Sequence, residues 1–581
     1  MKYKGDYGMK KYLMLILMLA VSLPAWAEET ALSLDEVGVT ATRAEEDVDK
    51  ISSNVTVITQ DDIKKSTATT VQDLLRNEAG IIVRDLYGTG TKSTVDMRGF
   101  ARGLNTAILL DGRKLNEIDL SGVDWNTIPL ENIERIEIVR GSESVLYGDN
   151  AMAGAINIIT KKGYAMKPEI VLDARAESYN GHTELGTLTG GTDRLGYFFF
   201  LKHRQTSGYR ENSDFTAADM STRLNFKLTD YLSFDVSAGY HTDDEGLPGG
   251  LTEQEVKDDR RQSTKPDDHV SYDQRYIATK ANIALGSWGD LELGYSYNDK
   301  KFDSDLFFFG LPFNVQRDTA TSGIKAKLTV DTRPFNLRNL LVAGIDYDDA
   351  TVTNATTFFG FTTDSDIKKS DTGLYIQDEL FLTDRLSLSL GYRYANTKFS
   401  DTVSGFGSVS DEQRFTEDAY RAGVTYNYAK GSKVFVNYAK GYRLPTTDEL
   451  FDFAGFITEL KPERSDTVEA GIVHAFGNRL QARITLFTMD VNDELFFNPA
   501  GGTFGLGANE NLDKTRHNGA ETGFTAAVTD SINVFGNLTY TDVKFKSGPY
   551  DGKHIQLVPN YSASVGADFR FLKSFLFAAN A

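Results

Sequence analysis

Side chains able to do nucleophilic, acid–base or metal chemistry are few and scattered in this sequence. There is no cysteine, and the seven histidines show no shared spacing: they are His182, His203, His241, His269, His474, His517 and His554. The motifs G-x-S-x-G and H-E-x-x-H are absent, and the glycine-bearing stretch 88–93 lacks the spacing of a phosphate-binding loop. We therefore expect no enzymatic activity.

Two acidic stretches are the best candidates for binding a metal ion. Carboxylate oxygens are the ligands that Ca²⁺ prefers, and they occur at Asp243, Asp244, Glu245, Asp267 and Asp268. The spacing of these residues is irregular, so the alternative is ordinary solvated charge on a loop. The sequence predicts no covalently bound cofactor and assigns no definite metal ligands.

Charge and hydropathy exclude two classes of protein and leave a third. The formal charge of -20 argues against a nucleic-acid partner, which usually meets a basic surface. A mean hydropathy of -0.33 argues against a bundle of membrane helices. A transmembrane β-barrel fits, because its strands alternate lipid-facing apolar and lumen-facing polar residues. The 27 Tyr and 36 Phe suit the aromatic girdles of such a barrel.

The N-terminus reads as a secretory signal peptide. Lys10 and Lys11 precede an apolar run over residues 12–23, and Ala25 and Ala27 form an A-x-A cleavage site. The run is shorter than the ~20 residues of a membrane-spanning helix. We expect cleavage after residue 27, with translation starting at either Met1 or Met9.

Beyond residue 163, long alternating runs typical of β-strands recur to the end of the chain. We count about eighteen of roughly ten residues each, the length of a tilted membrane-spanning strand. Short turns alternate with long connections, which we place at residues 242–270, 298–322, 350–370, 397–416, 442–464 and 491–518. A soluble sandwich or propeller is the alternative, but it rarely shows this two-sided asymmetry.

Residues 130–163 carry the most specific pattern. Two alternating runs, 133–139 and 155–159, flank Arg140 and Gly141 and predict a strand–turn–strand unit. Together with Arg98-Gly99-Phe100, Leu110-Asp111-Gly112-Arg113 and Leu146-Tyr147-Gly148, this unit closely resembles the plug domain of TonB-dependent outer-membrane receptors. Looser similarities to the same family lie at 441–450, 460–471 and 518–521.

The resemblance implies an antiparallel transmembrane β-barrel with an N-terminal α+β plug in its lumen, inserted in outer-membrane lipid as a monomer. We expect a signal peptide at 1–27, a TonB box and linker at 28–49, the plug at 50–162 and the barrel at 163–581. Barrels of the family have 22 strands, so about eighteen suggest a C-terminal truncation. An open barrel would expose unpaired strand edges to lipid.

The same resemblance assigns a segment to the energy-coupling partner TonB, which would pair with it by β-augmentation. This TonB box comprises Asp35, Glu36, Val37, Gly38, Val39, Thr40 and Ala41. In relatives, plug arginines meet barrel glutamates inside the lumen. Carried over, Arg98 and Arg140 are expected to pair with some of Glu463, Glu469 and Glu521.

The ligand is read from the aromatic residues of the long connections. An aromatic vestibule suits a planar or catecholate iron chelate, or a corrinoid, and its candidates are Phe307, Phe308, Phe358, Phe359, Phe453, Phe496 and Phe497. Several of these rings fit an aromatic girdle equally well. We expect energy-coupled uptake of an iron–siderophore, with cobalamin as the alternative. Haem is less favoured, since residues 445–462 contain no histidine, and a passive porin would need neither box nor plug.

Overall fold

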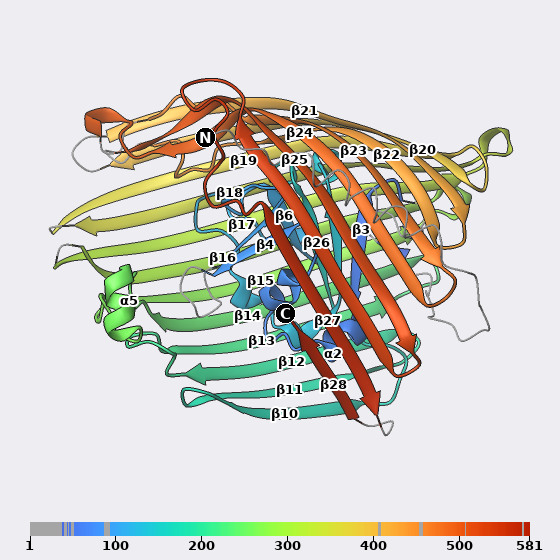
Figure 1. The fold of residues 1–581 in the computed structure, drawn as a ribbon, viewed down its shortest axis with the longest axis horizontal. Helices are drawn as coiled ribbons and strands as arrows, with labels where there is room; N and C mark the ends of the chain where they lie inside the picture. The colour runs from blue at the N-terminus through green and yellow to red at the C-terminus, as the bar shows by residue number, and fades with distance from the viewer. Residues whose placement is uncertain are drawn as a thin grey trace, which may run out of the picture.

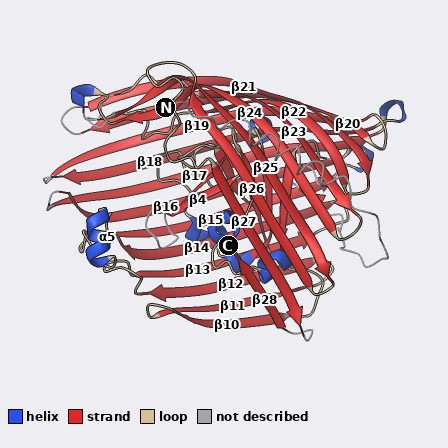
Figure 2. Cartoon of the chain, viewed as in Figure 1, coloured by secondary structure: helices blue, strands red, loops and turns tan. Residues whose placement is uncertain are grey.

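The computed structural model describes residues 38–39, 43, 46–47, 51–85, 93–308, 310–358, 360–404, 408–451, 457–505, 507–571 and 575–581. The expected signal peptide lies outside these residues. A small mixed domain, the plug, occupies the inside of a long curved sheet, the barrel sheet (Figure 1). Among the described residues, helices are confined to the plug and to short connections, whereas strands make up the surrounding wall (Figure 2).

The plug is built on a five-stranded sheet in the order β3-β8-β9-β6-β7, in which only the β6–β9 pair is parallel. Threonine caps start two of its helices: Thr59 forms a capping box with Asp62, and Thr70 accepts from the Asp73 amide. Its elements are β3 (Asn54–Thr59), α2 (Gln60–Lys65), α3 (Val71–Arg76), β4 (Ile81–Asp85), β5 (Ser93–Met97), β6 (Thr106–Leu110), β7 (Arg113–Lys114), η2 (Trp125–Thr127), η3 (Leu130–Asn132), β8 (Ile133–Arg140), α4 (Ser144–Tyr147) and β9 (Gly154–Thr160).

The barrel sheet contains nineteen antiparallel strands in strictly sequential order, β10 to β28, one more than we count from the sequence. Within the described residues β10 and β28 are its two edges. The strands are β10 (Glu169–Glu177), β11 (Gly181–Gly191), β12 (Leu195–Thr206), β13 (Phe215–Lys227), β14 (Leu232–Gly246), β15 (His269–Ala284), β16 (Asp290–Phe308), β17 (Leu311–Thr332), β18 (Arg338–Phe358), β19 (Phe361–Phe381), β20 (Leu386–Ser404), β21 (Ser408–Ala429), β22 (Ser432–Arg443), β23 (Glu463–Phe476), β24 (Leu480–Asn498), β25 (Ala508–Thr529), β26 (Ile532–Phe545), β27 (Tyr561–Phe571) and β28 (Phe575–Asn580).

Several connections expected to be long loops are strand instead. β17 and β18 run for 22 and 21 residues, so their hairpins extend well past the apolar band of ≈ 25 Å that lipid covers. The sequence masks this, because residues 298–322 and 350–370 are rich in Asp, Thr and Ser. These polar residues still pair across continuous ladders up to the hairpin tips. Connections without long strands remain at 247–268, which carries α5 (Glu253–Asp259), and, in the described residues, at 444–451 and 457–462.

Alternation gives the barrel sheet two chemically different faces. Along β20, Ser389 is 3% exposed and faces the plug, whereas the adjacent Leu390 is 59% exposed and faces outward. Further outward apolar side chains lie on other strands of the sheet, among them Leu374, Leu486 and Val565. The inner face is polar and holds the plug through charged contacts. Among the described helices, none is long and apolar enough to cross a membrane.

Candidate functional site

Arg98 joins the plug to strands β23 and β25 of the barrel sheet. Its side chain is fully buried, with Nη2 2.5 Å from Oε2 of Glu469 and Nε 3.5 Å from Oε1 of Glu521. Its guanidinium also lies 4.5 Å from the ring centroid of Phe487. Burial alone would lower the pKa of Arg98, but the two glutamates outweigh it and raise that pKa. Arg98 therefore stays charged and holds two barrel strands at once.

The backbone at Arg98 is shaped for this contact. Arg98 and Gly99 both have positive φ, 55° and 84°, which turns the chain sharply after β5. A Cβ on Gly99 would come within 2.4 Å of Val543, so only glycine allows this approach to the wall. The ring of His517 donates from Nδ1 to the carbonyl oxygen of Arg98 at 2.9 Å. The R-G-F sequence thus encodes a docking turn.

Arg140 corrects one expectation, because its ion pair lies within the plug. Its guanidinium donates to the carbonyl oxygen of Ala79 at 2.7 Å and to Thr56 Oγ1 at 2.7 Å, and lies 3.4 Å from Glu78. Burial and the nearby cation of Arg483 lower its pKa to about 10. Arg483 of β24 also contacts Glu78, at 3.5 Å, and Glu521 of β25 acts on Arg140 through its charge. Among the described residues, the ion pair of Arg140 is therefore with Glu78 of the plug rather than with a barrel glutamate.

Of the three glutamates expected as possible partners of plug arginines, Glu463 pairs with a barrel arginine. Its carboxylate lies 2.8 Å from Nε of Arg443, and the same guanidinium is 2.8 Å from Glu449. All three side chains are almost completely buried. The plug enters this cluster through Arg102, whose Nη1 is 3.0 Å from Glu449. Glu463 therefore braces the connection 444–462 rather than an arginine of the plug.

The segment carrying the predicted TonB box is anchored inside the lumen by Arg43. Two nitrogens of its guanidinium donate to both carboxylate oxygens of Asp346 on β18, at 2.9 and 3.0 Å. The guanidinium lies 4.5 Å from the ring centroid of Tyr375, and Lys327 donates to the Arg43 carbonyl oxygen at 2.8 Å. Burial alone would lower the pKa of Arg43, but Asp346 raises it well above its usual value. The sequence analysis missed this anchor.

Of the box itself, the structure describes only two residues. Gly38 and Val39 form the two-residue strand β1 (Gly38–Val39), which pairs with β2 (Glu46–Asp47). Val39 is fully buried and packs with Ile51 and Val139. Asp35, Glu36, Val37, Thr40 and Ala41 lie outside the described residues. The described part of the box is thus folded onto the plug.

Further plug–barrel ion pairs escaped the sequence analysis. Each joins a plug carboxylate to a barrel cation, the reverse polarity of the Arg98 contact. Among them are Glu143 with Arg421 at 2.8 Å, Asp149 with Lys369 at 2.8 Å and Asp111 with Arg223 at 2.9 Å. Charge pattern alone could not identify them, because the acidic chain offers many equivalent carboxylates.

A basin of about 490 Å³ opens on the side of the long hairpins, where plug and barrel meet. This size falls in the range of small-molecule sites. Arg102 and Leu120 of the plug contribute to its lining, as do Phe451 and Phe497 from the barrel. Hydroxyl, amide and carboxylate groups complete it: Asn354, Thr356, Thr363, Ser365, Asp448 and Asn509. The basin can therefore offer ring contacts, hydrogen bonds and one guanidinium to a ligand.

Among the described side chains, Phe307, Phe308 and Phe496 are not part of this basin's lining. Phe307 and Phe308 are at the tip of β16, where the Phe307 amide donates to Asp268 at 2.9 Å and the Phe308 side chain is 49% exposed. The ring of Phe496 faces Phe545 edge-on at 6.5 Å. Phe358 pairs with Phe361 through the backbone. Phe359 and Phe453 lie outside the described residues.

The acidic stretches are not uniformly solvated. Asp243, Glu245 and Asp268 are buried, whereas the Asp244 side chain is 64% exposed. Asp243, Asp244 and Glu245 lie on β14, where successive side chains point to opposite faces of the sheet. Asp243 and Glu245 therefore share one face, and Asp244 points to the other. The two buried residues of β14 thus face the plug, rather than forming one acidic loop.

Comparison with known proteins matches both parts of the chain. Residues 47–155 match the family model of the TonB-dependent receptor plug domain, and residues 204–580 match that of the TonB-dependent receptor-like β-barrel. The vitamin B12 transporter BtuB of Vibrio vulnificus (strain CMCP6) is 24% identical over 501 residues, 83% of this chain and 74% of that protein.

Solved structures share the fold. The unliganded ferric citrate transporter FecA superposes with a TM-score of 0.80 at 18% identity, over 95% of this chain and 86% of that one. The siderophore receptor PiuA of Acinetobacter baumannii gives a TM-score of 0.78 at 16% identity, over 95% and 89%. At these identities the likeness concerns the arrangement of plug and barrel sheet.

Proposed function

Since this chain belongs to the family of TonB-dependent receptors, we propose that it imports an iron–siderophore across the outer membrane, with TonB supplying the energy. Members of this family are outer-membrane receptors and transporters, not enzymes. The chain is accordingly an outer-membrane protein with a plug inside a strand-built wall.

The observation that carries the ligand proposal is the basin at the outer end of the plug. A chelate that exposes both aromatic rings and anionic oxygens matches its mixed lining, because Phe451 and Phe497 offer rings and Arg102 offers a cation. None of the described residues lining the basin is a histidine. That composition supports a siderophore over haem.

Cobalamin is the second candidate, and one finding favours it. The vitamin B12 transporter of Vibrio vulnificus matches 83% of this chain. A corrinoid is larger and exposes several amides but only one anionic group, a phosphodiester. It would use Asn354, Thr356 and Asn509 more than the guanidinium of Arg102. Bound Ca²⁺ in the outer connections, near Asp244 and Asp267, remains part of this alternative proposal.

The test compares the two ligand classes on the same cells. Cells lacking other receptors and expressing this chain are given ⁵⁵Fe-loaded catecholate, hydroxamate and citrate chelates, or ⁵⁷Co-cobalamin. We expect iron accumulation that stops when TonB is absent or when residues 35–41 are deleted. Cobalamin accumulation without iron accumulation would overturn the siderophore proposal in favour of the alternative.

Purified protein separates ligand binding from energy coupling. Arg102→Gln removes the cation of the basin and should weaken binding of an anionic chelate by at least about tenfold, since hydrogen bonds to charged groups contribute about 1.5–3 kcal/mol. Arg76→Gln, at an exposed position of α3, is the matched control. Equal affinity of both variants for every chelate would place the ligand elsewhere.

A further inference from the structure

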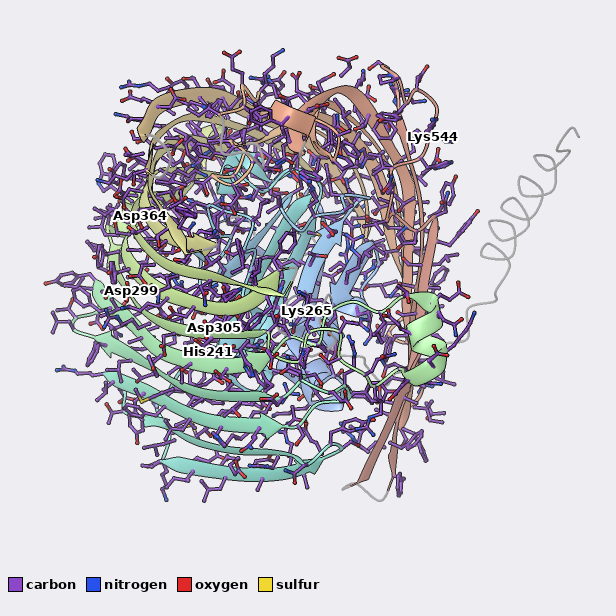
Figure 3. All side chains as sticks on the ribbon, turned by 90° about the vertical axis from the view of Figure 1, so that its left-hand side faces the viewer. His241, Lys265, Asp299, Asp305, Asp364 and Lys544 are labelled. Atoms are coloured by element: carbon purple, nitrogen blue, oxygen red, sulfur yellow. The ribbon has the colours of Figure 1, made fainter. Side chains whose placement is uncertain are left out.

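A histidine and two aspartates meet where the plug touches strand β14. His241 lies on β14 of the barrel wall (Figure 3). Asp243 is on the same strand, and Asp124 precedes η2 of the plug. One ligating atom from each residue lies within 4.8 Å of the other two. The His241 and Asp243 side chains are 5% and 2% exposed. Anything bound by all three would join the plug to the wall.

A fourth residue orients the histidine. Nδ1 of His241 is 2.7 Å from Oδ1 of Asp219, so that nitrogen donates its proton to the carboxylate. Nε2 then presents its lone pair to Oδ2 of Asp243, 3.0 Å away. Two acceptors at this distance require a cation between them, either a proton or a metal. A histidine that binds a metal through one ring nitrogen commonly donates its second ring N–H to a carboxylate, as His241 does to Asp219.

Unsatisfied oxygens point to the metal rather than the proton. Oδ1 of Asp243 is buried without a hydrogen-bond donor, and so is Oδ2 of Asp124. The other Asp124 oxygen accepts from the Asn126 amide at 3.2 Å. A proton on His241 would leave Oδ1 of Asp243 without a donor and Oδ2 of Asp124 with only the ammonium of Lys300, 3.8 Å away. Buried carboxylates rarely carry such a desolvation cost. A metal ion could be ligated by both residues.

The local charge has the sign that a cation requires. Glu117, Asp124, Asp219 and Asp243 bring four carboxylates to this region. Lys300 lies 3.7 Å from Glu117 and 3.8 Å from Asp124, and Arg113 also acts on Glu117. Asp119, further along the plug, is already paired with Arg317. Two cations against four carboxylates leave an excess of negative charge, and a divalent ion would offset that excess.

We propose that Asp124, His241 and Asp243 bind a divalent transition-metal ion that fastens the plug to β14, with Asp219 as the positioning residue. One imidazole nitrogen and two carboxylate oxygens suit Zn²⁺ and its first-row neighbours, whereas Ca²⁺ prefers oxygen ligands alone. None of these residues lines the outer basin. The bound ion is thus a structural fastener, separate from the transported chelate.

Metal binding by the purified full chain, stripped with chelator, tests this assignment. Zn²⁺ is titrated by calorimetry, and Co²⁺ is followed by its visible absorption bands. We expect one ion per chain at this cluster, with His241→Gln and Asp243→Asn each abolishing the Co²⁺ bands. Asp219→Asn should weaken affinity by about tenfold or more, as outer carboxylates do. The matched control is His203→Gln, from the exposed group of His182, Glu184 and His203, and it should keep the bands.

A variant of the plug tests whether the bound ion holds the plug to β14. Asp124→Asn removes the plug's ligand and leaves the residues of the barrel wall unchanged. Zn²⁺ should slow proteolysis of the plug in the wild type and leave the rate unchanged in Asp124→Asn. The proposal is overturned if the wild type binds neither ion, or if His203→Gln alone removes the binding. Unchanged metal affinity in His241→Gln would also overturn it.

Discussion

Arg98 illustrates how a buried cation can hold two domains together. Taking a guanidinium out of water is costly, and the cost is offset here by two carboxylates, a ring and a shared backbone contact. Such a contact is strong only while both partners remain. The remaining Glu469 and Glu521 would be left as uncompensated buried charges if Arg98 were removed.

Arg98→Ala should therefore release the plug more easily. Breaking a buried pair by removing one partner costs about 3–5 kcal/mol, so the urea concentration at which protease reaches the plug should fall clearly. Arg135→Ala is the control, because Arg135 is 20% exposed and its partners Glu134 and Glu137 belong to the plug. Similar urea midpoints for the two variants would argue against docking through Arg98.

The two plug arginines also show what sequence can and cannot predict at this scale. The R-G-F element located Arg98, and the structure brings it to Glu469 and Glu521. Arg140 occupies an equally specific element, yet its side chain turns back to the carbonyl of Ala79. Motif spacing fixes where an arginine sits on the chain. It does not fix the side-chain direction that selects a partner.

At the scale of elements, the alternation of apolar and polar residues predicted most strands and their order. It predicted the ends of the strands poorly. We placed loops wherever Asp, Thr and Ser replaced apolar residues, as at 298–322 and 350–370. There the outward positions meet water instead of lipid, so the apolar half of the alternation disappears while the ladder continues. Residues 444–451 and 457–462 lie outside the long strands, and the buried cluster around Arg443 holds this part of the chain.

Loss of the Arg43 side chain should release β1 and β2 from the inner face of the barrel sheet. Arg43→Ala removes the bidentate contact with Asp346 and the ring contact with Tyr375. The chain has no cysteine, so Val39→Cys gives a single thiol at a buried position. Its labelling rate should rise at least about tenfold in the Arg43→Ala background, since tenfold corresponds to only 1.4 kcal/mol.

The same labelling supplies its own control. Arg76→Ala changes an exposed arginine of α3 and should leave the rate at residue 39 unchanged. If Arg43→Ala also left it unchanged, the box segment would be held by the packing of Val39 on Ile51 and Val139 instead.

For the molecule as a whole, the outer face of the barrel sheet decides where the protein can reside. Leu390 is 59% exposed in the protein alone, and Tyr392 and Tyr394 follow it on the same face of β20. This order, aliphatic and then aromatic, is that of a lipid-facing strand approaching the interface. Leu390→Arg should thus destabilise the protein in bilayers by about 2–4 kcal/mol.

Depth in the membrane, rather than added charge, should govern this cost. Thr362→Arg introduces the same side chain at an exposed position near the tip of the β18–β19 hairpin, where water replaces lipid. Its free energy of unfolding in bilayers should stay close to that of the wild type. If both variants lost the same free energy of unfolding in bilayers, β20 would not face lipid at Leu390. If the losses were equal in detergent but not in bilayers, the detergent result would reflect the micelle. A cost confined to Leu390→Arg places the apolar belt around the lower half of β20, with the long hairpins standing clear of the membrane.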